Sequence, residues 1–234
     1  MIPLKDYNPT KRFPLFTVLL ILLNGLVFLA DILSGGLHEI VVPTPAGAMR
    51  VVDFIGGLTA RYALIPAHVT SNFSMEWPTV FSSMFLHGNW LHLGSNMLYL
   101  WIFGNNIEDS LGRFRFLLFY FVCGMAAAAL QIVAAPNSHT PMIGASGAVA
   151  GVMGAYILLY PNARVLTLIP LIIFFPLVEL PAYFIIGYWA FLQFISSAFM
   201  GGGETEGGGI AYLAHVGGFL AGLLLVFPLG GRRR

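Results

Sequence analysis

Two short motifs, far apart in the chain, carry residues that together could hydrolyse an acyl bond. Gly144-Ala-Ser-Gly147 places Ser146 among small residues, and Ala214-His-Val-Gly-Gly218 places His215 before two glycines. A serine hydroxyl is a weak nucleophile until a neighbouring base takes its proton, and an imidazole is the usual base. Ser146 and His215 are therefore a candidate nucleophile and general base, provided that the fold brings them together.

Glycines at helical spacing follow both residues. Gly147 and Gly151 come after Ser146, and Gly218 and Gly222 come after His215. Residues three or four apart share a helix face, and a face without side chains lets two membrane helices approach closely. The pattern predicts that these two helices pack together. Such glycine faces are also common where no chemistry occurs, so the serine motif alone does not establish a catalytic site.

A further pair of polar residues lies on the helix predicted over residues 85–104. His92 and Asn96 are four residues apart and so share one face. The oxyanion of an acyl intermediate needs hydrogen-bond donors. The candidates are the side chains of His92 and Asn96 and the backbone amide of Ser146, with Gly144 beside them. No acidic residue of the predicted spans lies at the same depth, which favours a catalytic pair over a triad.

The histidines also have less specific explanations. A single histidine inside a membrane helix is more often a packing or relay residue than a catalyst. His87, His92 and His215 could in principle hold zinc, since three protein ligands suffice for a catalytic site. The chain has no His-Glu-x-x-His helix and no evident carboxylate to support such ligands. We therefore predict no metal and no cofactor.

The composition indicates a membrane protein. Of 234 residues, 58% are hydrophobic and 9% are charged, against about 25% charged in soluble domains. The net charge of +1 gives no indication of nucleic-acid binding. Six apolar stretches are predicted as spans of an all-α bundle, at residues 14–34, 85–104, 116–135, 142–160, 182–199 and 210–229.

The remaining segments complete the predicted organisation. Residues 1–13 form a polar N-terminal segment, 14–231 the six-helix domain, and 232–234 a basic tail. Residues 35–81 form a long first loop, predicted to be partly embedded in the membrane. The proline-interrupted residues 165–177 are too few to cross a bilayer of about 30 Å, so they are assigned to a buried or interfacial connection.

Charge predicts the topology through the positive-inside rule. With six spans and both termini in the cytoplasm, the active site opens to the outer side, and the membrane is predicted to be a prokaryotic inner membrane. The cytoplasmic side then carries Lys5, Lys11, Arg12, Arg113, Arg115, Arg164 and the three terminal arginines.

Taken together, these motifs resemble the rhomboid family of intramembrane serine proteases. The matching segments are Gly144–Gly147, Ala214–Gly218, His87-Gly-Asn-Trp-Leu-His92 with Asn96, and Phe103-Gly-Asn-Asn-Ile-Glu108. The resemblance extends from about Tyr62 to Phe227. It implies a six-helix bundle in which Ser146 is the nucleophile and His215 the base. It also implies that the substrates are transmembrane helices entering beside the fifth span, with membrane lipid as the other partner.

Two positions depart from the family pattern. Characterised relatives often carry an aromatic residue four positions after the nucleophile, where its ring supports the imidazole, whereas this chain has Ala150. Some carry a Trp-Arg pair in the first loop, whereas this chain has Trp77-Pro-Thr79. On the fifth span, Phe191 and Phe194 are predicted to wedge against a neighbouring helix. The alternative function is a catalytically inactive relative that binds and escorts membrane helices. The oligomeric state is not predicted.

Overall fold

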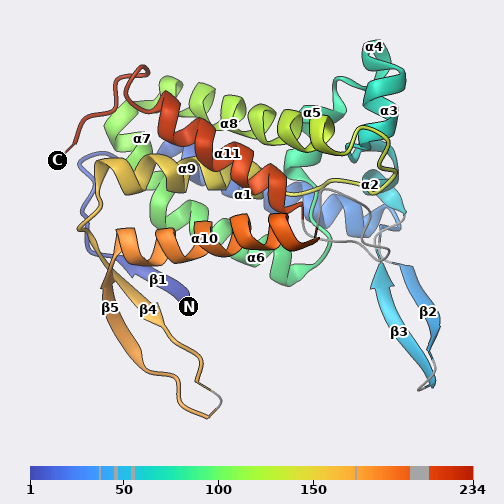
Figure 1. The fold of residues 1–234 in the computed structure, drawn as a ribbon, viewed down its shortest axis with the longest axis horizontal. Helices are drawn as coiled ribbons and strands as arrows, with labels where there is room; N and C mark the ends of the chain where they lie inside the picture. The colour runs from blue at the N-terminus through green and yellow to red at the C-terminus, as the bar shows by residue number, and fades with distance from the viewer. Residues whose placement is uncertain (37, 45–46, 54–55, 172, 201–210, 234) are drawn as a thin grey trace.

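The computed structural model describes residues 1–36, 38–44, 47–53, 56–171, 173–200 and 211–233. The long helices lie side by side with roughly parallel axes, and two β-hairpins point away from them (Figure 1). The helices are α1 (Leu15–Leu33), α2 (Gly57–Tyr62), α3 (Pro66–Ser71), α4 (Phe73–Glu76), α5 (Thr79–Ser82), α6 (Trp90–Tyr99), α7 (Asn105–Leu111), α8 (Arg113–Ala134), α9 (Ser146–Leu159), α10 (Ala182–Met200) and α11 (Tyr212–Leu225).

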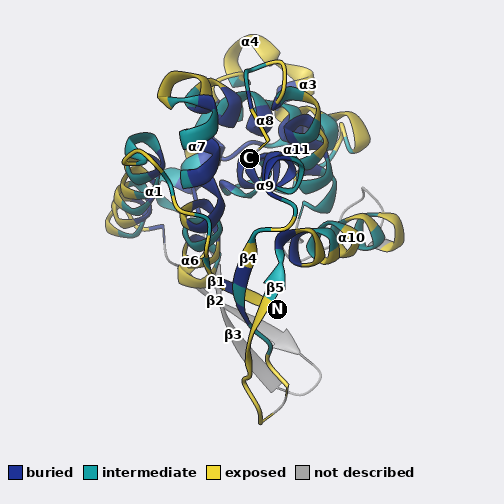
Figure 2. Cartoon of the chain, turned by 90° about the vertical axis from the view of Figure 1, so that its left-hand side faces the viewer, coloured by how far each residue is buried: buried dark blue, intermediate teal, exposed yellow. Residues whose placement is uncertain are grey.

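Among the residues that the structure describes, three helices are long and apolar enough to cross a membrane, namely α1, α8 and α10, while α9 and α11 are shorter apolar helices. This supports a mainly helical membrane protein, and the count of six spans stays a prediction. The 14 residues of α9 rise about 21 Å, less than a bilayer core. Figure 2 shows α9 at the buried centre of the bundle, with α1 and α10 at opposite sides.

The glycines explain why α9 and α11 lie so close together. A side chain at Gly218 would overlap the carbonyl oxygen of Gly147, and one at Gly222 would overlap that of Gly151. The two backbones therefore touch directly at two successive turns. This is the packing that the glycine spacing predicts.

The prediction of an all-α protein was wrong in one respect, because the described residues include five strands. They are β1 (Ile2–Asp6), β2 (His38–Thr44), β3 (Gly47–Asp53), β4 (Arg164–Leu168) and β5 (Leu177–Pro181). One antiparallel sheet has the order β1-β4-β5, and β2 pairs with β3. The segment assigned to a buried or interfacial connection is thus a β-hairpin. In β4, the β-branched Val165 and Thr167 are both fully buried and alternate with more exposed neighbours, as one covered face of a strand requires.

Several helix boundaries also differ from the predicted ones. The second span begins at Trp90 rather than residue 85, and its C-terminal part is a π-helix (Leu100–Gly104) that continues into α7. The fourth begins at Ser146 rather than 142. The first loop contains β2, β3 and the short helices α2 to α5, and its embedding in the membrane stays a prediction.

Candidate functional site

The side chains of Ser146 and His215 meet across the α9–α11 contact. Ser146 Oγ lies 2.7 Å from His215 Nε2, which is within hydrogen-bond distance. Both side chains are half-buried. The glycine-faced packing brings the backbones together, so that a short hydroxyl on one helix reaches the imidazole on the other.

The chain before Ser146 is held out of helical geometry. Gly144 has φ of +118°, which favours glycine and ends any helix approaching from residue 142. Its amide donates to Ser83 O at 2.9 Å. The amide of Ala145 lies 3.5 Å from Nε2 of the buried His87. Ser146 is therefore the first residue of α9. The first amides of a helix have no partner within it, so the Ser146 amide is placed to donate to an anion.

His92 and Asn96 lie on the first turns of α6, one turn apart. Asn89 caps α6, because its Oδ1 accepts the His92 amide at 2.8 Å. A side-chain carbon on Gly144 would lie 2.7 Å from His92 Nε2, so His92 lies against the loop that leads to Ser146. Asn96 is buried, and its Nδ2 donates to His92 O at 3.0 Å, which uses one of two amide hydrogens. The structure thus brings His92 to the loop before Ser146, and Asn96 bonds to the backbone of His92.

Two residues of α10 that sequence reasoning missed also contact His215. Gln193 Oε1 lies 2.7 Å from His215 Nδ1. The Trp189 ring lies 5.8 Å from the imidazole, centroid to centroid, at 39°. Residues 189 and 193 are four apart, so one face of α10 carries both. Gln193 is the one amide side chain in the predicted fifth span, and this was the signal that could have identified it.

Trp189 also accounts for the first departure from the family pattern. Ala150 is fully buried in α9 and offers no ring to the imidazole. An aromatic ring from α10 contacts the imidazole instead. Phe191 and Phe194, by contrast, are 59% and 60% exposed, so the prediction that they wedge against a neighbouring helix was wrong.

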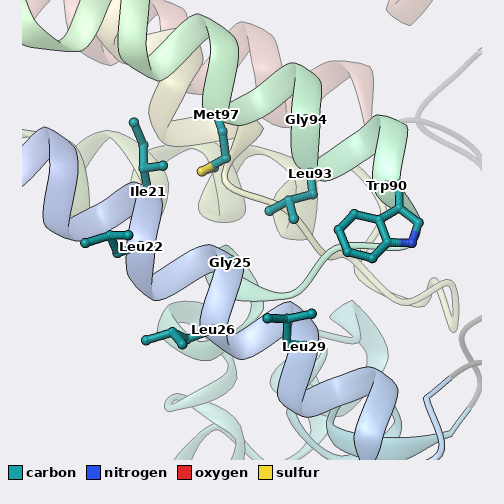
Figure 3. Close-up of a pocket in the computed structure, with 9 residues that line it drawn as sticks. All are labelled: Ile21, Leu22, Gly25, Leu26, Leu29, Trp90, Leu93, Gly94 and Met97. Atoms are coloured by element: carbon teal, nitrogen blue, oxygen red, sulfur yellow. The ribbon is translucent and has the colours of Figure 1, made fainter.

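An apolar groove lies elsewhere, between α1 and α6. It has a volume of about 500 Å³ and is lined by apolar side chains and two glycines (Figure 3). Leu93 and Trp90 line it from α6, on a different face from Asn96. No ionisable side chain lines this groove, so it does not contribute to the candidate site. Among the residues that the structure describes, no three metal-ligating side chains are arranged to hold a metal ion.

Comparison with known proteins identifies the family. The Rhomboid domain family model matches residues 74–232, which is more than half of the chain. The chain therefore belongs to the rhomboid family. "Rhomboid protein 1, mitochondrial" of Saccharomyces cerevisiae is 32% identical over 170 residues, covering 70% of this chain and 44% of that protein. "Rhomboid protease GluP" of Bacillus subtilis is 32% identical over 108 residues, covering 45% of this chain and 21% of that protein.

A chloroplast protein is also similar. "Rhomboid-like protein 11, chloroplastic" of Arabidopsis thaliana is 35% identical over 82 residues, covering 35% of this chain and 29% of that protein. The chain spans less than half the length of each of these relatives. They come from mitochondria, chloroplasts and a bacterium, so they do not favour the predicted prokaryotic membrane over an organellar one.

Proposed function

We propose that this protein is an intramembrane serine endopeptidase that cleaves peptide bonds in or beside transmembrane segments of other proteins. The observation that carries the proposal is the 2.7 Å contact between Ser146 Oγ and His215 Nε2. A protein that only binds helices has no need of a hydroxyl in contact with an imidazole at the start of a helix. Membership of a family that includes a named protease supports the same conclusion.

The proposed reaction follows the usual course of acyl transfer. His215 Nε2 takes the Ser146 hydroxyl proton as Oγ attacks the carbonyl carbon of the scissile bond. The resulting oxyanion accepts a hydrogen bond from the Ser146 amide, assisted by the start of α9, with His92 and Asn96 as further donors. His215 then gives the proton to the leaving amine. A water molecule, activated by the same imidazole, releases the acyl group from Ser146. No cofactor takes part.

A six-span topology with both termini inside fits the contacts at one end of the bundle. The Lys11 amide donates to Asp109 Oδ2 at 3.1 Å, the Arg232 amide lies 3.3 Å from Ser110 Oγ, and Arg233 Nε donates to Leu158 O. These contacts gather basic residues from the N-terminal segment and the C-terminal tail at the end opposite Ser146. By the positive-inside rule, that end faces the cytoplasm and the site opens outward. A reporter placed after Arg234 should be cytoplasmic, and one inserted at Gly207 external.

The decisive experiment uses the purified full chain in detergent with a panel of transmembrane substrates, read by product mass, and a fluorophosphonate label. Ser146→Ala should abolish both cleavage and labelling while the melting temperature stays close to that of the wild type, because alanine fits the same small-residue surroundings. His215→Ala should also abolish both, because the hydroxyl then has no base. Undiminished labelling of either variant would place the nucleophile or its base elsewhere.

A further variant tests the oxyanion role. Loss of one oxyanion donor typically lowers kcat by about 10²–10³ with little change in KM, because the donor acts mainly in the transition state. Asn96→Ala should show this split. If activity fell only in step with the melting temperature, Asn96 would be a packing residue that bonds to its own helix at His92 O.

A further inference from the structure

We propose that Gln193 on α10 is a positioning residue, which holds His215 in the tautomer and orientation that leave Nε2 free to accept the proton of Ser146. The proposal rests on the proposed function and adds to the dyad a third, neutral residue from a different helix. The observation behind it is the 2.7 Å contact between Gln193 Oε1 and His215 Nδ1.

The chemistry of the two groups gives the direction of this bond. An amide oxygen only accepts hydrogen bonds, so Nδ1 must carry the proton and donate it. A neutral imidazole has one proton, so Nε2 then has a free lone pair directed at Ser146 Oγ, 2.7 Å away. The Ser146 hydroxyl must therefore donate to Nε2. This is the arrangement that a general base needs before the reaction begins.

Among the described residues around His215, Gln193 is the side chain that accepts a hydrogen bond from Nδ1. Trp189 contacts the ring but offers no acceptor for Nδ1, since its indole N–H only donates. Among the described residues, His92 of α6 is the other titratable side chain near His215. No carboxylate among the described residues bonds to either ring nitrogen. Gln193 thus occupies the position of the acid of a serine–histidine–acid triad without supplying its charge.

The hydrogen bond between Gln193 and His215 depends on where α10 lies relative to α11. None of residues 187–199 of α10 is buried, so this half of the helix contacts its neighbours only in part. Ile185 and Ile186, nearer the start, are buried, and the Ala182 amide donates to Ala163 O at 2.9 Å. If residues 187–199 moved away from α11 by about 1 Å, the 2.7 Å contact between Gln193 Oε1 and His215 Nδ1 would exceed hydrogen-bond distance. His215 is therefore correctly oriented only while α10 packs against α11.

Two substitutions at one position test the role. Gln193→Met keeps the length of the side chain but offers Nδ1 only a thioether sulfur, a much weaker acceptor than an amide oxygen. It should lower kcat, and the rate of fluorophosphonate labelling, by about 2- to 12-fold, the equivalent of one net hydrogen bond, with KM nearly unchanged. Gln193→Glu keeps the acceptor, so its kcat at high pH should stay within about threefold of wild type.

The pH profile gives a readout that a structural role would not move. The base must be neutral, so kcat/KM rises with pH through the pKa of His215. A carboxylate beside Nδ1 favours the protonated ring, so Gln193→Glu should move the acid limb to higher pH by about one unit. Ser197→Ala is the matched control, because Ser197 Oγ donates only within α10, to Phe194 O. It should change neither kcat nor the profile.

Nitrogen-15 spectra of the imidazole test the inference apart from catalysis. Wild-type His215 should show a protonated Nδ1 and an unprotonated Nε2 even if no substrate is cleaved, and Gln193→Met should lose this preference. Failure of the proposed function is thus distinguishable from failure of this proposal. An Nε2-protonated ring in the wild type would overturn the proposal, because Gln193 would then donate its NH2 to Nδ1. Wild-type kcat in Gln193→Met, or a loss explained by its melting temperature, would also overturn it.

Discussion

The two ring nitrogens of His215 bond to helices that pack very differently. Nε2 meets Ser146 on α9, whose backbone touches that of α11 at two glycine pairs. Nδ1 meets Gln193 on α10, where none of residues 187–199 is buried, whereas most residues of α9 are. One contact is fixed by backbone packing that leaves no space, and the other depends on a helix at the edge of the bundle (Figure 2).

This difference fits the demands of the proposed reaction, the cleavage of a membrane helix. The nucleophile and its base must stay within hydrogen-bond distance, which close backbone packing provides. A substrate helix must also reach these two residues from the lipid, so at least one helix of the bundle must be able to move aside. Of the helices that contact His215, α10 is the one with few buried residues, and the family resemblance implies entry beside it. A bond from α10 to the imidazole therefore links the position of this helix to the state of the base.

The largest expected effect comes from filling the glycine contact. Gly218→Ala places a methyl group on the Gly147 carbonyl, so α9 and α11 must separate. Overpacking typically costs about 1–3 kcal/mol, and a clash with backbone should lie at the upper end. Thermal unfolding in detergent should show the loss, and fluorophosphonate labelling of Ser146 should fall with it.

The matched control is a glycine on the loosely packed helix. A side chain at Gly187 of α10 would meet no atom within 4 Å. Gly187→Ala should therefore leave the melting temperature equal or slightly higher, since alanine favours helix more than glycine does. Equal losses from Gly187→Ala and Gly218→Ala would remove the contrast between the two helices.

An intermediate effect is expected on α10, where two aromatic residues lie on different faces. Trp189 contacts His215, whereas Phe191 is 59% exposed. Trp189→Leu should lower kcat by about 2- to 12-fold, the range of one aromatic contact. Phe191→Leu should change it by less than about twofold. The ratio of the two kcat values is measured by cleavage of one substrate by both variants, corrected for the folded fraction of each. A larger loss in Phe191→Leu would mean that the exposed face of α10 takes part in catalysis.

The same two faces show how far the sequence could predict the site. The meeting of Ser146 and His215 was predictable, because glycine spacing fixes both which helices touch and which faces do so. Which face of α10 contacts His215 was not predictable. Its aromatic residues lie all around the helix, so composition gave no periodic pattern, and Phe191 and Phe194 were assigned to the interface in place of Trp189. A single polar side chain, Gln193, marked the correct face.

The fold was predictable to a similar degree. Apolar runs identified the helices α1, α8, α9, α10 and α11, although several ends were misplaced by a few residues. The β4–β5 hairpin was missed, because an apolar stretch of this length with prolines is ambiguous by periodicity alone. The second sheet partner of β4 is β1, more than 150 residues earlier in the chain, and no local pattern indicates a pairing so distant.

The smallest expected effect concerns the end of the bundle away from Ser146, where Asp6 is the last residue of β1. Its Oδ2 accepts hydrogen bonds from Tyr156 of α9 at 2.8 Å and from Asn106 of α7 at 2.7 Å. Burial raises the pKa of Asp6 above its ordinary value of 3.8, and the hydrogen bonds offset this in part. The folded protein therefore holds this proton more tightly than the unfolded chain does. Its contribution to stability is largest at low pH and declines as the pH rises through the folded-state pKa.

Asp6→Asn should remove this decline while keeping an oxygen that accepts both hydrogen bonds. The melting temperatures of wild type and variant should agree near pH 4 and separate above it, with the variant the more stable. The kcat should stay unchanged, because Asp6 lies at the end of the bundle away from Ser146. Glu179→Gln, at an exposed carboxylate of β5, is the control and should give a curve parallel to wild type. Parallel curves for Asp6→Asn as well would mean that the Asp6 carboxylate is stabilised as fully in the folded state as in water. Its contacts with Tyr156 and Asn106 would then offset the whole cost of burial.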